Sequence, residues 1–419
     1  MNPWPLVLAD LRANRAGAVA IVLLVALAVS LGVAVSAQER ALREGSARAA
    51  ERFDLVVGAP GSETQLVLSA VYLQASAIDL LSGAVLDELS REGQAALVSP
   101  LGFGDNYRGH PVVGVTPAFV GHLAGGRPLD EGRNLGRLDE AVVGAEVRVP
   151  VGAELEPAHG QVETDEAERH EGFAYRVVGK LPRLGNPWDR AIVVPIEAVW
   201  LVHALPLGHA VDEAALHPRG DAGPPDFSTV PLGPPWDPAH LPGVPAIVVK
   251  PASFAAAYQL RQEYRARDDA TAVFPAEVLV QLYGLLGDVR DLVAVISVLT
   301  QVLVIGAVLL AVLASLAQRR RLIGVLRALG ASRGFVFATV WSGVALMLAV
   351  AGALGLGLGY LSALLLSRLF AAETGVALPV ALSGQELGLV LAIAAAGLLL
   401  ATIPAALAYR GSVAAALRG

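Results

Sequence analysis

The sequence contains no cysteine, only two lysines, and a charged fraction of 16%. Without cysteine there is no disulfide scaffold, no thiol catalysis and no thiolate metal site. A phosphate-binding loop requires Gly-Lys-Ser/Thr, but Lys180 is followed by Leu181, and Lys250 is preceded by Val249. The chain is therefore predicted to be no ATP-hydrolysing enzyme by itself and to hold no cofactor of its own.

Apolar residues are abundant instead, at 54% of the chain, with a mean hydropathy of +0.57. Uncharged runs long enough to cross about 30 Å of hydrocarbon as helices occur in several places. They predict four transmembrane helices over residues 16–37, 292–317, 335–367 and 387–409. Residues 35–37 also resemble a signal-peptide cleavage site, but the first run exceeds the usual signal-peptide core, which favours a retained anchor.

Arginines in the short links set the orientation of these helices. The link between the second and third helices holds five Arg and no acid, whereas the next link holds Arg368 with Glu373 and Glu386. The arginine-rich side is therefore predicted to be cytoplasmic. Residues 1–15, 318–334 and 410–419 then lie in the cytoplasm, and residues 38–291 and 368–386 lie outside it.

The large segment 38–291 carries nearly all the acid of the chain, because only Asp10, Glu373 and Glu386 lie elsewhere. Its negative charge disfavours binding to nucleic acid or to anionic lipid. No nucleic-acid partner is therefore predicted.

Short β runs and short helical patterns alternate inside this segment, which is typical of an α+β domain. Helical stalks are predicted at its two ends, over 38–53 and 276–291, and Gly185-Asn186-Pro187 predicts a turn. The β runs are 55–57, 111–115, 176–179, 191–194 and 246–249, and the helical patterns are 84–92, 196–203 and 253–267. The predicted fold class is an α-helical membrane protein with four transmembrane helices, one plus three, and a large α+β extracytoplasmic domain between the first and second.

Two loops stand out within the domain. Residues 206–245 hold ten prolines and are predicted to form an extended surface excursion. Residues 154–172 contain His159, Glu168 and His170, and imidazole with carboxylate is a donor set that Zn²⁺ accepts. Because these residues lack the tight, repeated spacing of a ligand set, a solvated acidic loop is the competing interpretation.

The cytoplasmic segment 318–334, QRRRLIGVLRALGASRG, has the most specific pattern in the chain. Its apolar residues recur at i, i+3, i+4 and i+7, which predicts one stripe of a short amphipathic helix ended by glycine. Plain topology explains the arginines but not the apolar stripe. The residues predicted to contact a partner at the inner membrane surface are Arg320, Arg321, Leu322, Val325, Leu326, Arg327, Leu329 and Gly330.

The run from Arg319 to Arg333 resembles the coupling segment of FtsX-like, MacB-type ABC transporter permeases, and residues 403–418 are similar to the last span and tail of that family. The resemblance implies a MacB-like periplasmic core and a permease homodimer in the bacterial inner membrane. It also implies a separate ABC ATPase that binds ATP and Mg²⁺, and a periplasmic adaptor or effector. Family members usually have an acid where Leu322 stands, so a salt bridge from that position is not carried over.

The predicted function is mechanical coupling of a partner's ATP hydrolysis to motion of the external domain, for export or extraction of a substrate. Gly355 and Gly359 form a GxxxG pair that lets helices pack closely, although plain packing is an equal interpretation. Two alternatives stay open: activation of an external enzyme without transport, and metal-related transport through residues 154–172.

Overall fold

The computed structural model describes residues 2–74, 76–159, 173–211, 216, 226–282, 295, 298, 299, 302, 306 and 327–410. The chain divides into two compact units. The first, here called the helical unit, comprises Met1–Arg43, Leu285–Leu369 and Leu378–Gly419, and the second, the sheet unit, comprises Glu44–Gly284 and Phe370–Ala377.

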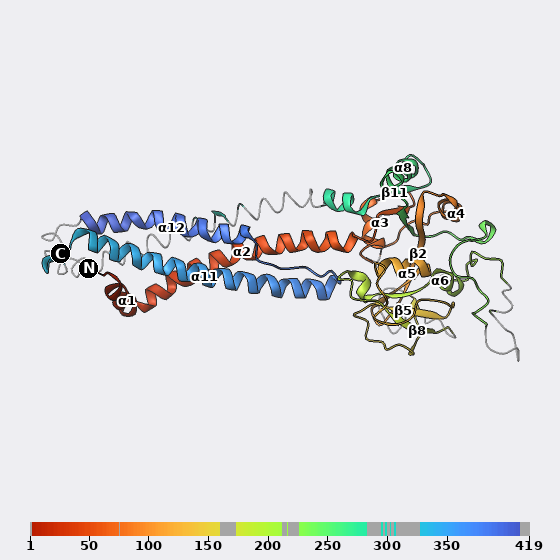
Figure 1. Ribbon diagram of the computed structural model, residues 1–419, viewed down its shortest axis with the longest axis horizontal. Helices are drawn as coiled ribbons and strands as arrows, with labels where there is room; N and C mark the ends of the chain where they lie inside the picture. Colours follow the sequence, from red (N-terminus) through yellow and green to blue (C-terminus); the bar gives the residue numbers. More distant parts are fainter. Residues whose placement is uncertain are drawn as a thin grey trace. The chain divides into compact units, whose positions relative to one another are not determined.

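The helical unit contains α1 (Trp4–Ala13), α2 (Arg15–Ala50), α11 (Arg333–Thr374) and α12 (Gly384–Arg410). The three long helices run alongside one another (Figure 1) and share a core that includes Val29, Leu348 and Ile393. Each of the three is long and apolar enough to cross a membrane. The predicted second span, 292–317, lies almost wholly outside the described residues, so three of the four predicted helices can be compared with the structure.

Leucines on the outer faces of these helices are exposed to the surroundings of the protein. Leu27 of α2 is 63% exposed, Leu365 of α11 is 53% exposed and Leu399 of α12 is 70% exposed. Large exposed apolar surfaces mark contact with a partner or a membrane. The exposed leucines and the lengths of the three helices together indicate a transmembrane protein.

The helix boundaries differ from the sequence-based prediction in two places. The first span and residues 38–50 of the predicted stalk 38–53 form one continuous helix, α2, with the expected i, i+4 ion pairs Glu39–Arg43 and Glu44–Arg48. Helix α11 continues to Thr374, past residue 367, so the predicted external loop 368–386 is irregular only between α11 and α12.

A mixed sheet forms the framework of the sheet unit. Its strand order is β11-β1-β10-β2-β3-β9-β5-β8-β4, with β6 paired to β8 and β7 paired to β2. The β3–β9 and β5–β8 pairs are parallel and the others antiparallel. The strands are β1 (Leu55–Gly58), β2 (Ala95–Tyr107), β3 (His110–Val115), β4 (Glu131–Gly132), β5 (Glu140–Val143), β6 (Glu154–Leu155), β7 (Ala158–His159), β8 (Tyr175–Lys180), β9 (Ile192–Pro195), β10 (Ala246–Pro251) and β11 (Thr271–Val273).

Short helices cover both faces of this sheet. They are α3 (Glu63–Ala70), α4 (Gly83–Arg91), α5 (Pro117–Leu123), α6 (Ile196–Val202) and α8 (Phe254–Arg265), with 3₁₀ turns η1 (Pro187–Arg190) and η2 (Pro238–His240). The hydroxyls of Ser62, Ser82 and Ser253 accept hydrogen bonds from backbone N–H groups and so cap α3, α4 and α8. Each of the β runs and helical patterns predicted for the domain coincides with one of these elements.

Two apolar cores lie on opposite faces of the sheet, because successive strand residues point to opposite sides. On β9, Ile192 and Val194 belong to the core with α4, α6 and α8, whereas Val193 belongs to the core with α3 and α5. All three are fully buried. A strand buried on both faces is apolar at every position, which explains the uninterrupted apolar runs in the sequence.

Strand β2 changes partners along its length. Residues up to Leu101 pair with β10, and from Gly102 onward the strand pairs with β3. The register shifts between Gly102 and Asp105, where Gly104 has φ 145. Such a bulge bends the strand and redirects side chains at that point.

Candidate functional site

The C-terminal turn of α11 is packed within the sheet unit. Arg190 donates hydrogen bonds from Nη1 to the carbonyl oxygens of Ala372 at 3.0 Å and Glu373 at 3.1 Å. The Ala377 N–H donates to the carbonyl oxygen of Gly185 at 3.1 Å. Carbonyl groups at a helix C-terminus have no partner within the helix, and a guanidinium there satisfies both their hydrogen bonding and the helix dipole.

The segment 184–190 is held in shape for this contact by its own side chains. The Asp189 carboxylate accepts hydrogen bonds from the N–H groups of Leu184 at 2.7 Å and Gly185 at 2.6 Å. Asn186 accepts from the N–H of Trp188 at 3.1 Å and caps η1. Burial raises the pKa of Asp189, although those two N–H groups act to lower it. The predicted turn at 185–187 therefore also contacts the chain that follows α11, through Gly185.

The end of α2 reaches the same place. Phe53, just after α2, packs its ring 5.8 Å from the ring of Trp188, centroid to centroid, and 5.9 Å from Phe119. Trp188 is fully buried and donates from Nε1 to the carbonyl oxygen of Val71 at 3.2 Å. The chain that follows α2 and the segment that receives α11 thus meet at one buried indole, which we call the Trp188 junction.

The GxxxG glycines face α2. A Cβ on Gly355 would lie 2.7 Å from the carbonyl oxygen of Ala26, and one on Gly359 would lie 2.7 Å from the carbonyl oxygen of Ser30. Both distances are too short for any side chain. These glycines let the backbones of α11 and α2 touch, as small residues do between membrane helices.

The predicted coupling residues are described only in part. Arg320, Arg321, Leu322, Val325 and Leu326 lie outside the described residues. Leu329 is 79% exposed, and Gly330 has φ +98, a conformation suited to glycine after a helical turn. Ser332 then caps α11 by accepting from the N–H of Phe335 at 3.2 Å.

Of the three predicted metal candidates, only His159 belongs to the described residues. Glu168 and His170 lie outside them, and His159 is described only as a backbone partner of Asp105 in the β2–β7 pair. A different acidic group, Glu88, Glu92 and Glu263, has carboxylate oxygens within 4.8 Å of one another.

That acidic group has protein partners. Arg267 donates to Glu88 at 2.8 Å, and Tyr264 donates to Glu92 at 3.4 Å. Burial, with the charges of Glu263 and Glu88 beside it, raises the pKa of Glu92. A cation in the form of Arg267 already stands among these acids, so they form an ion-pair cluster on the surface.

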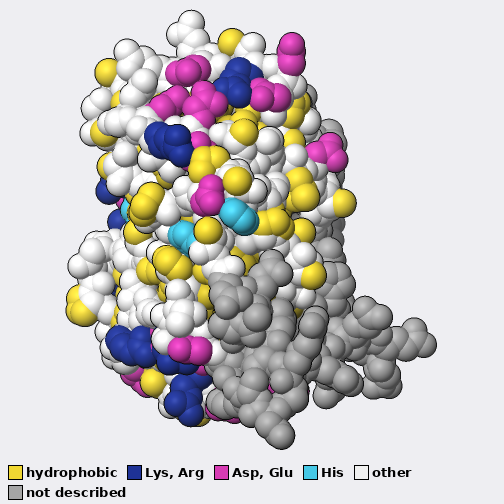
Figure 2. Space-filling model, turned by 90° about the vertical axis from the view of Figure 1, so that its right-hand side faces the viewer, with side chains coloured by type: hydrophobic (Ala, Val, Ile, Leu, Met, Phe, Trp, Pro, Cys, Tyr) yellow, Lys and Arg dark blue, Asp and Glu magenta, His cyan; other side chains and the backbone are white. Residues whose placement is uncertain are grey.

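Charge on the visible surface of the sheet unit is mixed. Figure 2 shows acidic and basic side chains beside one another, without a continuous basic area among the described residues of that face.

The C-terminal part of the chain is similar to a known protein family. Residues 294–414 match the family model described as FtsX-like permease C-terminal. This match includes the segment 318–334 and all of α11 and α12. The resemblance predicted from the sequence is confirmed: over these residues the chain is similar to the FtsX-like permeases, which are membrane subunits of ABC transporters.

Among solved structures, the chain is similar to the periplasmic region of MacB from Actinobacillus actinomycetemcomitans, with 11% identity and a TM-score of 0.32. The match covers 56% of this chain and 95% of that chain. No curated protein matches the sequence.

Proposed function

We propose that this chain is a permease subunit that passes movement from a cytoplasmic ATPase to the sheet unit outside the membrane. The observation that carries this proposal is the Trp188 junction, where the chain following α2 and the segment receiving α11 meet. Phe53, three residues after the end of α2, packs on Trp188, and Arg190, two residues after Trp188, bonds the last turn of α11, so movements of both helices reach the same short segment.

The lengths of these helices support such a role. With 36 residues in α2 and 42 in α11, a rise of about 1.5 Å per residue gives lengths of about 54 Å and about 63 Å. The hydrocarbon core is only about 30 Å thick. Both helices are therefore long enough to cross the membrane and continue as rods, so a tilt at the cytoplasmic end is transmitted without a loop to absorb it.

Helix α11 begins at Arg333, within the last two residues of the segment 318–334, which is its proposed cytoplasmic end. In the proposed mechanism a separate ABC ATPase binds ATP and Mg²⁺, closes, and presses on this segment. Two permease chains in the bacterial inner membrane bind two ATPase chains on the cytoplasmic side. The sheet units then move a substrate on the outer side, with a periplasmic adaptor or effector receiving it, because the predicted spans carry no charged residue for an ion path.

The test uses the complex reconstituted with its ATPase in lipid nanodiscs. Because the chain lacks cysteine, an Ala255→Cys variant carries a single environment-sensitive fluorophore on the exposed face of α8. ATP is expected to change the fluorescence in the otherwise native chain. Arg190→Ala, which removes the bonds to Ala372 and Glu373, is expected to reduce that change while ATP is still hydrolysed.

Arg183→Ala is the matched control. Arg183 lies directly before the segment 184–190 but pairs with Glu146 on the surface, where its side chain is 71% exposed. It is expected to leave the ATP-dependent change intact. An active complex whose fluorescence is indifferent to ATP, or equal responses from the two arginine variants, would contradict transmission through the junction.

A further inference from the structure

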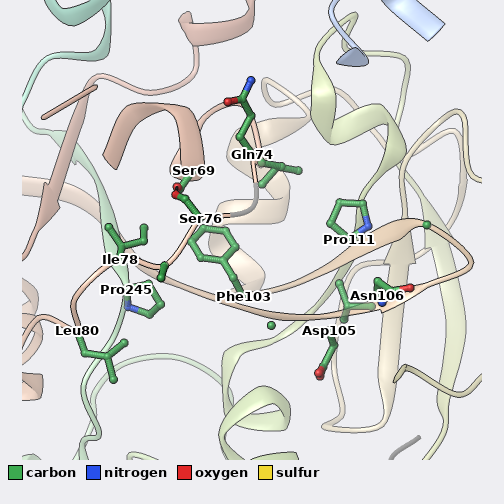
Figure 3. A pocket seen from close by; sticks show the side chains of 15 residues that line it. Ser69, Gln74, Ser76, Ile78, Leu80, Phe103, Asp105, Asn106, Pro111 and Pro245 are labelled. Carbon is green, nitrogen blue, oxygen red and sulfur yellow. Dashed lines mark hydrogen bonds between the residues drawn. The ribbon is translucent and has the colours of Figure 1, made fainter. Parts of the chain in front are cut away.

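A cavity of about 410 Å³ opens in the sheet unit where β2 changes partners. Its wall on one side consists of Leu73, Gln74 and residues 76–78 with Leu80, and on the other of the bulged part of β2 with Phe103. Figure 3 shows these side chains, among them Ser69, Ser76 and Ile78. Ligand cavities of roughly 300–1,000 Å³ are typical of sites for small organic molecules.

The bulge explains why Phe103 lines this cavity. Gly102 pairs with Gly114 of β3 and Asp105 pairs with Val112, so Phe103 and Gly104 are the unpaired residues of a bulge within the β2–β3 pair. Bulges occur next to binding sites, where they redirect a side chain. Gly104, also in the lining, keeps this turn of the strand free of a second side chain.

The opposite wall is preformed. The hydroxyls of Ser69 and Ser76 are 2.6 Å apart, and Gln65 donates from Nε2 to the carbonyl oxygen of Ala77 at 2.9 Å. Leu73 has φ 53, a left-handed conformation that a leucine rarely adopts. Such strain persists only where the surrounding structure imposes it, and it is frequent at ligand sites.

The chemistry of the lining defines the ligand. Apolar groups dominate, including Phe103, Ile78 and Leu80, the last of which is 62% exposed at the rim. The described lining residues include no Lys or Arg, and the one carboxylate among them, Asp105, points away from Phe103 and Ser76 in Figure 3 and lies 3.7 Å from His203. Moving a charge into such a site without a counter-charge is costly, whereas hydroxyl and amide groups there satisfy a neutral polar group.

We propose that this cavity binds an uncharged, largely aromatic or aliphatic small molecule that carries a neutral hydrogen-bonding group. The ring of Phe103 forms an apolar wall for its body, and the serine hydroxyls and the amide of Gln74 receive its polar group. This site belongs to the sheet unit alone, so its occupancy is measured without the ATPase and independently of the coupling mechanism.

The test is protection of a single cysteine in the full chain in nanodiscs. Ala77→Cys places a thiol in the lining, and Ala255→Cys places one on exposed α8 outside it. Each is labelled with a maleimide in the presence of tryptophol, indoleacetate or tryptamine, which share an indole and differ in charge. Mass action predicts that tryptophol at about ten times its Kd slows labelling of Ala77→Cys about tenfold and leaves Ala255→Cys unchanged.

The two charged probes are expected to need at least about tenfold higher concentrations, since no counter-charge faces the cavity. Phe103→Ala in the Ala77→Cys chain is expected to weaken protection by about threefold to tenfold. Phe254→Ala, which removes a ring that is 80% exposed outside the cavity, is the control. The proposal is overturned if all three probes protect Ala77→Cys equally, or if tryptophol gives no protection up to its solubility limit. If Phe103→Ala does not fold, the labelling of Ala77→Cys alone decides between these outcomes.

Discussion

Arg40 of α2 and Glu386 of α12 form an ion pair inside the helical unit. Arg40 donates from Nη1 to Oε1 of Glu386 at 2.7 Å, and the Glu386 side chain is fully buried whereas that of Arg40 is 21% exposed. Ser36 also donates to Oε1 of Glu386, at 3.0 Å, and the Ser383 N–H donates to Oε2 at 2.8 Å. A buried carboxylate with this many donors fixes the start of α12 against α2.

Arg40→Ala is predicted to destabilise the helical unit by about 3 kcal/mol, because it leaves the buried charge of Glu386 without its counter-charge. Arg43→Ala is the control on the same helix: it breaks an ion pair with Glu39 whose side chains are 60% and 33% exposed, and is predicted to cost less than about 1 kcal/mol. Unfolding in mixed detergent and SDS measures both. Equal losses from the two variants would show that the pair with Glu386 has no special role.

Gly355→Ala is predicted to destabilise the packing of α11 on α2 by about 1–3 kcal/mol. The added Cβ would lie 2.6 Å from the Cβ of Val29, and the helices must move apart to admit it. Gly357→Ala is the matched control, because a Cβ there meets nothing within 4 Å. It is predicted to be neutral or to stabilise by about 0.5–1 kcal/mol, since alanine is the better helix former. The same SDS titration distinguishes them, and a reversed order would contradict the observed packing.

Much of the fold follows from local sequence patterns. The apolar runs predict α2, α11 and α12, and the short β runs predict strands such as β9, because periodicity is a property of neighbouring residues. The GxxxG spacing likewise indicated glycines that the structure places against α2. These features depend on residues close together in the chain, which is the information a single sequence carries.

The contacts that suggest function were missed for the opposite reason. Arg190 and Ala372 are 182 positions apart, and Arg40 and Glu386 are 346 positions apart. In the sequence alone, Arg190 lies between a predicted turn and a predicted strand, and Glu386 lies in a predicted short external loop. The cavity at Phe103 depends on a register shift within the β2–β3 pair, which no local sequence pattern predicts. For Glu386, the available signal was its position directly before the apolar run 387–409, because a carboxylate near the membrane is costly unless it is paired.

The acid stability of the sheet unit is predicted to depend on Glu140. Burial would raise the pKa of Glu140, but hydrogen bonds from the Arg133 side chain and from the N–H groups of Gly136 and Arg137 outweigh it and lower the pKa below 4.5. A carboxyl whose pKa is lowered on folding contributes stability above its unfolded pKa. That contribution is lost as the pH falls through the lowered value.

Glu140→Gln is therefore predicted to lower the free energy of unfolding by about 1.5 kcal/mol at neutral pH. This value is low for hydrogen bonds to a charged group because Arg133 is largely exposed. The difference from the native chain is predicted to shrink as the pH falls below 4.5. Thermal unfolding across this pH range, followed by Trp fluorescence, measures it. A difference that stays constant with pH would mean that the carboxylate charge contributes nothing.

Leu329→Asp is predicted to lower the stimulation of the partner ATPase by the permease without lowering the stability of the chain. Leu329 is 79% exposed, so its replacement removes no core contact, and an exposed change of this kind is worth at most about 0.5 kcal/mol. A carboxylate in an apolar docking stripe, by contrast, is predicted to weaken binding to the ATPase by about tenfold or more. Gly330→Ala provides the comparison for structure, since φ +98 strains any side chain there. If Leu329→Asp left ATPase stimulation and co-purification unchanged, the stripe would not be the docking surface, and the arginines of 318–334 would serve topology alone.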